Sequence, residues 1–175
     1  MSDGLNDEGG GAPETQPELF YPAVIPREEG HPTFAQFRIV GTGDERGKGL
    51  RGNVGFRQGQ CVARISGVLV RCSGINTIQM SPQLHVYDPW FCRFLLHSCD
   101  PNLVVDVGAM AVRATRDIAS GEYLTIDYAA TEDVIANQFA CHCGAAGCRG
   151  WMMGRREGPN AAGRALLEAR KGGQR

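Results

Sequence analysis

Short apolar runs separated by glycine-rich turns dominate the chain and predict strands rather than helices. Strand-like runs cover residues 34–40, 61–65, 68–70, 75–80, 103–107, 109–114 and 123–128. Gly108 separates two of these runs, as in a hairpin, and Pro82 is expected to end another. Many short strands joined by glycine turns predict a mainly β fold of several small sheets.

Helical patterning is scarce. Residues 88–96 carry apolar side chains at a roughly helical spacing, and residues 161–171 predict a charged helix near the C-terminus. The apolar stretch over residues 19–26 is interrupted by prolines, so we expect it to be extended and packed on the domain rather than in a central strand. Residues 1–17 offer almost nothing to bury and are expected to be disordered.

The net charge of the chain is concentrated in its N-terminal and C-terminal segments. Residues 1–30 carry seven acidic and one basic side chain, residues 31–154 have a net charge of +1, and residues 155–175 have a net charge of +4. The nearly neutral centre gives no reason to expect direct nucleic-acid binding. No apolar run approaches the ~20 residues of a membrane span, and we find no secretory signal. We therefore expect a cytoplasmic protein, or a nuclear one if the source is eukaryotic.

Three of the seven cysteines crowd into a C-x-C-x4-C cluster, formed by Cys141, Cys143 and Cys148. Without a signal peptide, this spacing indicates metal ligation rather than disulfides. Zinc takes four tetrahedral ligands and favours thiolates, so one ligand must come from elsewhere. The residues leave four candidates for it: Cys92, His97, Cys99 and His142. A site closed by four ligands has no open position for water, so we expect a structural zinc.

Two further stretches are ambiguous when taken alone. Residues 47–50, Gly-Lys-Gly-Leu, match no complete phosphate-binding motif, and an ordinary turn would explain them. Residues 93–102 run from apolar side chains into His, Ser, Cys, Asp, Pro and Asn. Adjacent residues cannot form a catalytic relay. Cys99 activated by His97 is one interpretation, in which a metal would compete for the same thiolate.

Taken together, four motifs in this order resemble those of the SET-domain protein lysine methyltransferases. Residues 47–50 resemble the family's G-x-G-L, and residues 93–102 resemble R-F-x-N-H-S-C-x-P-N. Residues 121–128 resemble G-E-E-L-T-x-D-Y, and residues 141–150 resemble the post-SET motif C-x-C-x4-C-x-G. The resemblance implies a SET fold of several small curved sheets, with a pseudoknot and a C-terminal zinc lid.

This resemblance also implies how the chain is divided. We expect an acidic, largely disordered segment over residues 1–30 and a SET domain over residues 31–131. A post-SET zinc-binding segment is expected over residues 132–154, followed by a basic tail over residues 155–175.

The resemblance assigns roles to individual residues. Tyr128 matches the tyrosine whose hydroxyl lies at the methyl-transfer channel. S-adenosylmethionine would be bound by main-chain groups of Gly47, Lys48, Gly49, Leu50, Leu96 and His97, with Phe139 covering it. Cys99 matches the family's fourth zinc ligand, beside Cys141, Cys143 and Cys148.

One position departs from the family pattern. Leu96 stands where the family has Asn, and leucine cannot make the hydrogen bond of an Asn side chain. Because Phe94 and Leu95 make the approach to His97 apolar, we expect apolar surroundings at Leu96 as well.

The resemblance implies transfer of a methyl group from S-adenosylmethionine to a lysine amine of a protein or peptide. Two alternatives remain at this stage. The same chemistry on a free amino acid, small amine or short peptide is one, because only a short segment precedes Arg93 where the family often has a longer insert. The other is a non-catalytic, zinc-stabilised interaction module.

Overall fold

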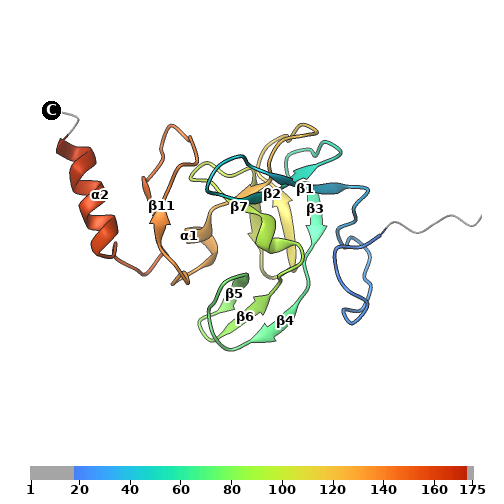
Figure 1. Ribbon diagram of the computed structural model, residues 1–175. Coiled ribbons are helices and arrows are strands. Elements are labelled where there is room, and N and C mark those ends of the chain that lie inside the picture. Colours follow the sequence, from blue (N-terminus) through green and yellow to red (C-terminus); the bar gives the residue numbers. More distant parts are fainter. Residues whose placement is uncertain (1–17, 173–175) are drawn as a thin grey trace, which may run out of the picture.

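The computed structural model describes residues 18–172 (Figure 1). Over these residues the chain forms twelve strands, two α-helices and one 3-10 helix. The strands are β1 (Phe37–Gly41), β2 (Lys48–Gly52), β3 (Cys61–Arg64), β4 (Val68–Val70), β5 (Thr77–Ser81), β6 (Leu84–Tyr87), β7 (Leu96–His97), β8 (Leu103–Asp106), β9 (Ala111–Ala114), β10 (Thr125–Ile126), β11 (Phe139–Ala140) and β12 (Trp151–Met152). The helices are η1 (Cys92–Phe94), α1 (Tyr128–Thr131) and α2 (Ala161–Gly172).

The strands form five small sheets, none larger than three strands in the described part of the chain. β1 pairs with β2, and β11 with β12, both antiparallel. Two antiparallel sheets have the strand orders β3-β9-β8 and β4-β6-β5, whereas β7 and β10 are parallel. The mainly β fold of small sheets that we predicted is therefore confirmed. Among the described residues, the helices are too short or too polar to cross a lipid bilayer.

A cluster of aromatic rings forms the centre of the core. Phe37 and Phe91 are fully buried, and their ring centroids lie 5.2 Å apart at a steep angle. Phe56 stacks on Phe37, and Phe20 meets Phe91 edge-on. Such pairs add to the hydrophobic stabilisation of the rings.

The segment before residue 31 contributes to this core. Phe20 and Tyr21 are both buried, so the proline-rich stretch packs on the domain as expected. Leu19 also forms a β-bridge with Thr33. The disorder predicted for residues 1–17 lies outside the described residues.

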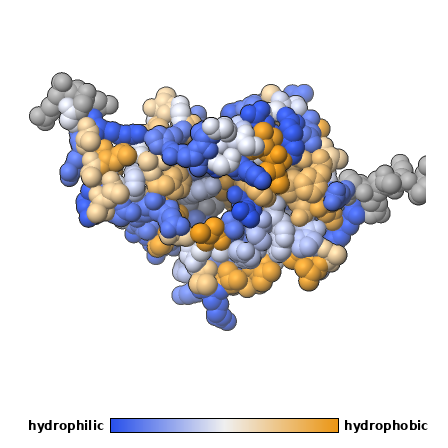
Figure 2. Space-filling view, viewed as in Figure 1, coloured by the Kyte–Doolittle hydropathy of each residue, from blue (hydrophilic) through white to orange (hydrophobic). Residues whose placement is uncertain are grey.

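The β4-β6-β5 sheet projects from the rest of the molecule at the bottom of Figure 1. Val68 and Leu69 on its edge strand β4 are largely exposed, and Figure 2 shows hydrophobic residues along the lower edge of the same view. β6 lies at the centre of this sheet, although we did not predict it. Its four residues follow Pro82 closely, and only pairing with β4 and β5 identifies them as a strand.

The helix predicted over residues 88–96 is wrong in extent. Only η1 is helical, and Leu95 is already extended, with φ −70° and ψ 117°. The carboxylate of Asp88 explains the local structure, because it accepts hydrogen bonds from the backbone N–H groups of Trp90, Phe91 and Cys92 at 3.0 Å. These bonds hold a tight turn. The chain then leaves η1 to join β7, whose pairing with β10 outweighs the local helical pattern.

The strand predicted over residues 123–128 is also too long. β10 covers two residues, and Tyr128 is the first residue of α1 rather than part of a strand. The cause is Asp127, whose side chain accepts a hydrogen bond from the N–H of Ala129 and so caps the helix. Two other predictions hold: β8 and β9 form the hairpin around Gly108, and α2 covers the expected C-terminal helix.

We predict that Asp88→Asn lowers the free energy of unfolding by about 2–3 kcal/mol. Asp88 is fully buried and also accepts the hydroxyl of Tyr21 at 2.9 Å, so all its donors would face an amide that can accept at one atom only. Urea unfolding followed by tryptophan fluorescence measures the loss. Tyr21→Phe is the matched comparison and should cost about 1–2 kcal/mol, because it removes one member of the network. Two variants as stable as the parent would contradict this role.

Candidate active site and metal centre

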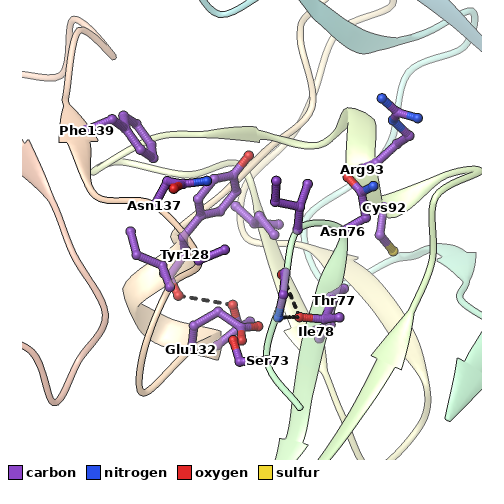
Figure 3. A pocket seen from close by; sticks show the side chains of 16 residues that line it. Ser73, Asn76, Thr77, Ile78, Cys92, Arg93, Tyr128, Glu132, Asn137 and Phe139 are labelled. Atoms are coloured by element: carbon purple, nitrogen blue, oxygen red, sulfur yellow. Dashed lines mark hydrogen bonds between the residues drawn. The ribbon is translucent and has the colours of Figure 1, made fainter. Parts of the chain in front are cut away.

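Two cavities of similar size share one wall. Cavity A, of about 370 Å³, is lined by Arg46, Leu96, His97 and residues 139–143, among others. Cavity B, of about 360 Å³, lies between residues 73–78 and residues 131–137 and also contains Arg93 (Figure 3). Tyr128 and Phe139 line both cavities. A ligand in cavity A and another in cavity B would therefore meet at these two aromatic residues.

The hydroxyl of Tyr128 is fixed by one short hydrogen bond. It donates to the backbone carbonyl of Leu95 at 2.7 Å. Burial raises the pKa of Tyr128 to about 12, so the hydroxyl keeps its proton at neutral pH. Because its hydrogen is directed at Leu95, the oxygen offers its lone pairs to a donor in the cavity. Tyr128 is thus placed to accept a hydrogen bond rather than to remove a proton.

His97 lies next to Tyr128 and is uncharged at neutral pH. Burial lowers its pKa to about 4, and the charge of Arg149 acts in the same direction against that of Asp127. Its Nδ1 accepts the backbone N–H of Tyr128 at 3.3 Å, and its Nε2 lies 3.5 Å from the sulfur of Cys99. His97 therefore connects the wall of cavity A to the cysteine cluster.

The Gly47–Leu50 motif adjoins cavity A only through the residues that precede it. β2 begins at Lys48, so only Gly47 lies in the turn, and Leu50 is fully buried in the core. None of the four motif residues is among the described residues that line cavity A. The preceding residues Glu45 and Arg46 line it instead, although we had not singled them out.

Gly49 determines how closely β2 approaches Leu96. A Cβ added at Gly49 would lie 2.7 Å from Cδ1 of Leu96 and 3.1 Å from the ring of Tyr123. The side chain of Leu96 thus fills the space that a larger residue at position 49 would need. The apolar surroundings that we expected for Leu96 stay a prediction.

Four cysteine sulfurs converge beside cavity A. Those of Cys99, Cys141, Cys143 and Cys148 all lie within 4.8 Å of one another. A tetrahedral zinc ion with Zn–S bonds of about 2.3 Å places its sulfurs about 3.8 Å apart, and Cys99 and Cys141 are separated by 3.8 Å. The thiol set therefore fits a zinc ion. It also selects Cys99 from the four candidates for the fourth ligand, because Cys92, His97 and His142 are not members of the group.

Backbone N–H groups point at the sulfurs of this cluster. Cys99 donates its N–H to Cys143 at 3.4 Å, and Arg149 donates its own to Cys99 at 3.4 Å. Burial opposes ionisation of Cys143, but the N–H groups of Cys99 and Ala145 help to lower the pKa of this thiol to about 6. Thiolates are the form that binds metal.

An ion pair connects the cysteine segment to the end of β10. The guanidinium of Arg149 donates to both carboxylate oxygens of Asp127, one of them at 3.0 Å. The same carboxylate caps α1, where Tyr128 begins the helix. The cysteine cluster and the hydroxyl of Tyr128 are thus held by adjacent parts of one network.

The SET domain family model matches residues 17–129. The chain belongs to the SET domain family. The match covers β1 to β10 and the first residues of α1, whereas the C-x-C-x4-C cluster lies beyond it. This confirms the SET-domain resemblance that the first three motifs indicated.

Named relatives match parts of the chain. "Histone-lysine N-methyltransferase 2D" of Homo sapiens is 38% identical in an alignment of 66 residues that covers 34% of this chain and 1% of that protein. "Methyltransferase flvH" of Aspergillus flavus is 33% identical over 84 residues, or 45% of this chain and 46% of that protein. The chain thus spans less than half the length of these relatives.

A solved structure supports the fold. The structure of KRYPTONITE in complex with mCHH DNA, H3(1-15) peptide and SAH has a TM-score of 0.55 and 24% sequence identity to this chain. The aligned part covers 66% of this chain and 29% of that one. At this identity, the likeness shows the SET fold of the described domain.

We predict that Gly49→Ala lowers the free energy of unfolding by about 1–3 kcal/mol, because its methyl group displaces Leu96 and overpacks the site. Gly41→Ala on the adjacent strand is the control. A Cβ there meets nothing within 4 Å, so its effect should stay within about 0.5 kcal/mol. Thermal unfolding measures both. If the steric argument holds, Leu96→Ala in the Gly49→Ala background destabilises less than Leu96→Ala in the parent. Equal losses would contradict it.

Proposed function

We propose that this chain is an S-adenosylmethionine-dependent N-methyltransferase that acts on the lysine side-chain amine of a protein. One observation carries the proposal: two separate cavities meet at Tyr128 and Phe139. A methyl donor in cavity A and a lysine chain in cavity B would bring sulfur, methyl and nitrogen together at this shared wall. The names of the histone-lysine methyltransferase relatives support the same substrate class.

Cavity A has a lining that suits S-adenosylmethionine. Leu96 and Phe139 offer apolar surface for a flat ring. Glu45 and Arg46 also line the cavity, where Arg46 is paired with Asp44 at 2.7 Å and Glu45 lies 3.2 Å from His142, and a ligand's amino-acid end would add to or replace these pairs. Bound there, S-adenosylmethionine supplies an activated methyl group on a sulfonium. The chain's own residues would exclude water and hold the donor in one orientation, with Phe139 as part of the cover.

Cavity B would prepare the acceptor. A lysine amine has a pKa of about 10.4, so it must lose a proton before it can attack. The apolar side chains of Ile78 and Ile126 in the cavity favour its neutral form. The oxygen of Tyr128, whose hydrogen is directed at Leu95, would accept a hydrogen bond from the amine and align its lone pair. Catalysis then rests on alignment rather than on a strong base.

We further propose a structural zinc ion on Cys99, Cys141, Cys143 and Cys148. The geometry of the four sulfurs supports it. Residues 139–143, which form one wall of cavity A, include two of these cysteines. The metal would therefore fix the wall of cavity A through Cys141 and Cys143, without touching a reacting atom.

The acceptor class can be tested directly. Incubation with labelled S-adenosylmethionine and either recombinant histone H3 or acetyl-lysine-amide separates protein from small-amine acceptors. Label in the histone supports the proposal, and label in the small amine alone favours the alternative substrate class. Absence of cofactor binding by calorimetry would favour a non-catalytic module. That this chain does not bind nucleic acid directly stays a prediction.

We predict that Tyr128→Phe lowers turnover at least tenfold and leaves the affinity for S-adenosylmethionine nearly unchanged. The ring is kept, but the oxygen that would orient the amine is lost; one lost hydrogen bond to a reacting group is worth about this factor. Single-turnover methylation and calorimetry measure the two quantities. Tyr123→Phe is the control, because its hydroxyl donates to Gly41 and lines neither cavity. Turnover equal to that of the parent would remove Tyr128 from this role.

We predict about one equivalent of zinc per chain after exhaustive dialysis, set by one four-ligand site. Cys143→Ser should release the metal and increase proteolysis of the C-terminal segment, because one of four ligands is gone. Cys72→Ser is the control, since Cys72 is exposed and outside the cluster, and it should retain the metal. Elemental analysis of the three dialysed proteins measures their zinc content. A parent protein that is folded and active without metal would refute the site.

A further inference from the structure

Cavity B is lined by a buried carboxyl group, that of Glu132, with one oxygen that makes no hydrogen bond to the described residues. Glu132 follows α1 directly and is only 7% exposed. Its Oε1 accepts the backbone N–H of Gln79 at 2.8 Å. Its Oε2 has no hydrogen-bond partner among the described residues. A buried oxygen without a hydrogen bond calls for an explanation, and a bound water, ion or ligand is one.

The neighbouring polar groups are already engaged elsewhere. The hydroxyl of Thr131 donates to the carbonyl of Tyr128 at 3.1 Å, and its proximity also helps to lower the pKa of Glu132. Arg155 donates to the carboxylate of Asp133 at 2.7 Å and to the carbonyl of Ala130 at 3.0 Å. The hydroxyl of Ser73 donates to the carbonyl of Val134. Oε2 of Glu132 is therefore left without a hydrogen bond from these groups and can accept one from outside the chain.

The state of the carboxyl group is consistent with a missing cation. Burial raises the pKa of Glu132 to about 7, against the lowering effects of the Gln79 N–H group, the Thr131 hydroxyl and the charge of Arg155. A cation in the cavity would favour the ionised form and reverse this shift.

The position of Glu132 within the cavity indicates which cation it would take. In Figure 3 the ring of Tyr128 points upward, towards the level of Phe139 and Arg93, whereas Glu132 lies below, beside Ser73. The target amine has to reach the end where Tyr128 meets cavity A. The carboxylate is then left for a second positive group on the same substrate. Arg93, the cation in the upper part of the cavity, disfavours that group there.

We propose that Glu132 binds the guanidinium or ammonium group of a second basic residue of the substrate, close in sequence to the target lysine. This inference rests on the proposed lysine methyltransferase function. It assigns to the chain a preference for acceptor segments with two basic residues, and it makes Glu132 a specificity-determining residue. A buried carboxylate oxygen and a guanidinium form a strong, charge-assisted hydrogen bond, whereas an uncharged side chain cannot replace the charge.

Synthetic twelve-residue peptides test this preference. Each contains one lysine among Gly, Ser and Ala, with a single Arg at one of the four positions on either side, and a matched set carries Gln in place of Arg. For the parent protein we expect kcat/KM to be about tenfold higher for Arg than for Gln in at least one register. Glu132→Gln keeps the acceptor for the Gln79 N–H group but removes the charge, so the ratio should fall to about one.

Glu168→Gln is the matched control, because Glu168 is an exposed acid on α2 and should leave the ratio unchanged. A parent protein that methylates Arg and Gln peptides equally in every register would overturn the proposal. So would a Glu132→Gln variant that keeps the preference. Equal loss of activity on both peptide sets would assign Glu132 to the target amine instead and would also overturn the proposal.

A binding measurement separates this inference from the proposed function. The backbone amide of Gln79 reports on Glu132 in ¹H–¹⁵N NMR spectra, because it donates a hydrogen bond to the Glu132 side chain. Titration with acetyl-arginine-amide should shift this signal in the parent but not in Glu132→Gln, and acetyl-glutamine-amide should shift it in neither. If no peptide is methylated but this pattern is seen, the cation site stands and the methyltransferase proposal fails. If peptides are methylated without the shift or the Arg preference, the cation site fails alone.

Discussion

The candidate site depends on the two interactions of the Asp127 carboxylate, a helix cap and an ion pair. This carboxylate ends β10 by capping α1 and thereby sets the direction in which Tyr128 leaves the strand. The same group binds both arms of Arg149, whose backbone N–H points at the sulfur of Cys99. A helix cap and an ion pair of this kind are individually modest. Here they share one carboxylate, so the position of Tyr128 and that of the cysteine segment are coupled.

The buried groups around this carboxylate are held in uncharged forms. Burial keeps the proton on Tyr128 and keeps His97 neutral, so neither titrates near pH 7. Both instead make directed hydrogen bonds. The hydroxyl of Tyr128 donates to the carbonyl of Leu95, and the ring of His97 accepts the backbone N–H of Tyr128. These two side chains therefore have little acid–base capacity but a fixed geometry. An in-line methyl transfer needs geometry more than proton transfer, and this is the sense in which the arrangement suits the proposed chemistry.

Local patterns predicted the class of fold and most strands, because alternation and glycine turns act over a few residues. These patterns failed where contacts with residues distant in the sequence determine the local structure. Residues 88–96 have a helical pattern, but the turn held by Asp88 and the pairing of β7 with β10 override it. Cysteine spacing left Cys99 as one of four candidate ligands, and only the family resemblance singled it out; the fold places it beside Cys141, 42 positions away. Glu132 belongs to no motif, so only its burial against Gln79 made it visible.

The shared wall of the two cavities is completed outside the stretch that the family model matches. Phe139 is on β11, which pairs with β12. α2 supports β12 in turn: Gly163 packs so closely on Trp151 that a Cβ there would lie 2.5 Å from the indole ring. The matched residues 17–129 supply Tyr128, His97 and Leu96, whereas the opposing aromatic face depends on the cysteine segment and α2. Shape at the reacting end is therefore a joint property of the SET core and the C-terminal elements, and neither part alone forms both cavities.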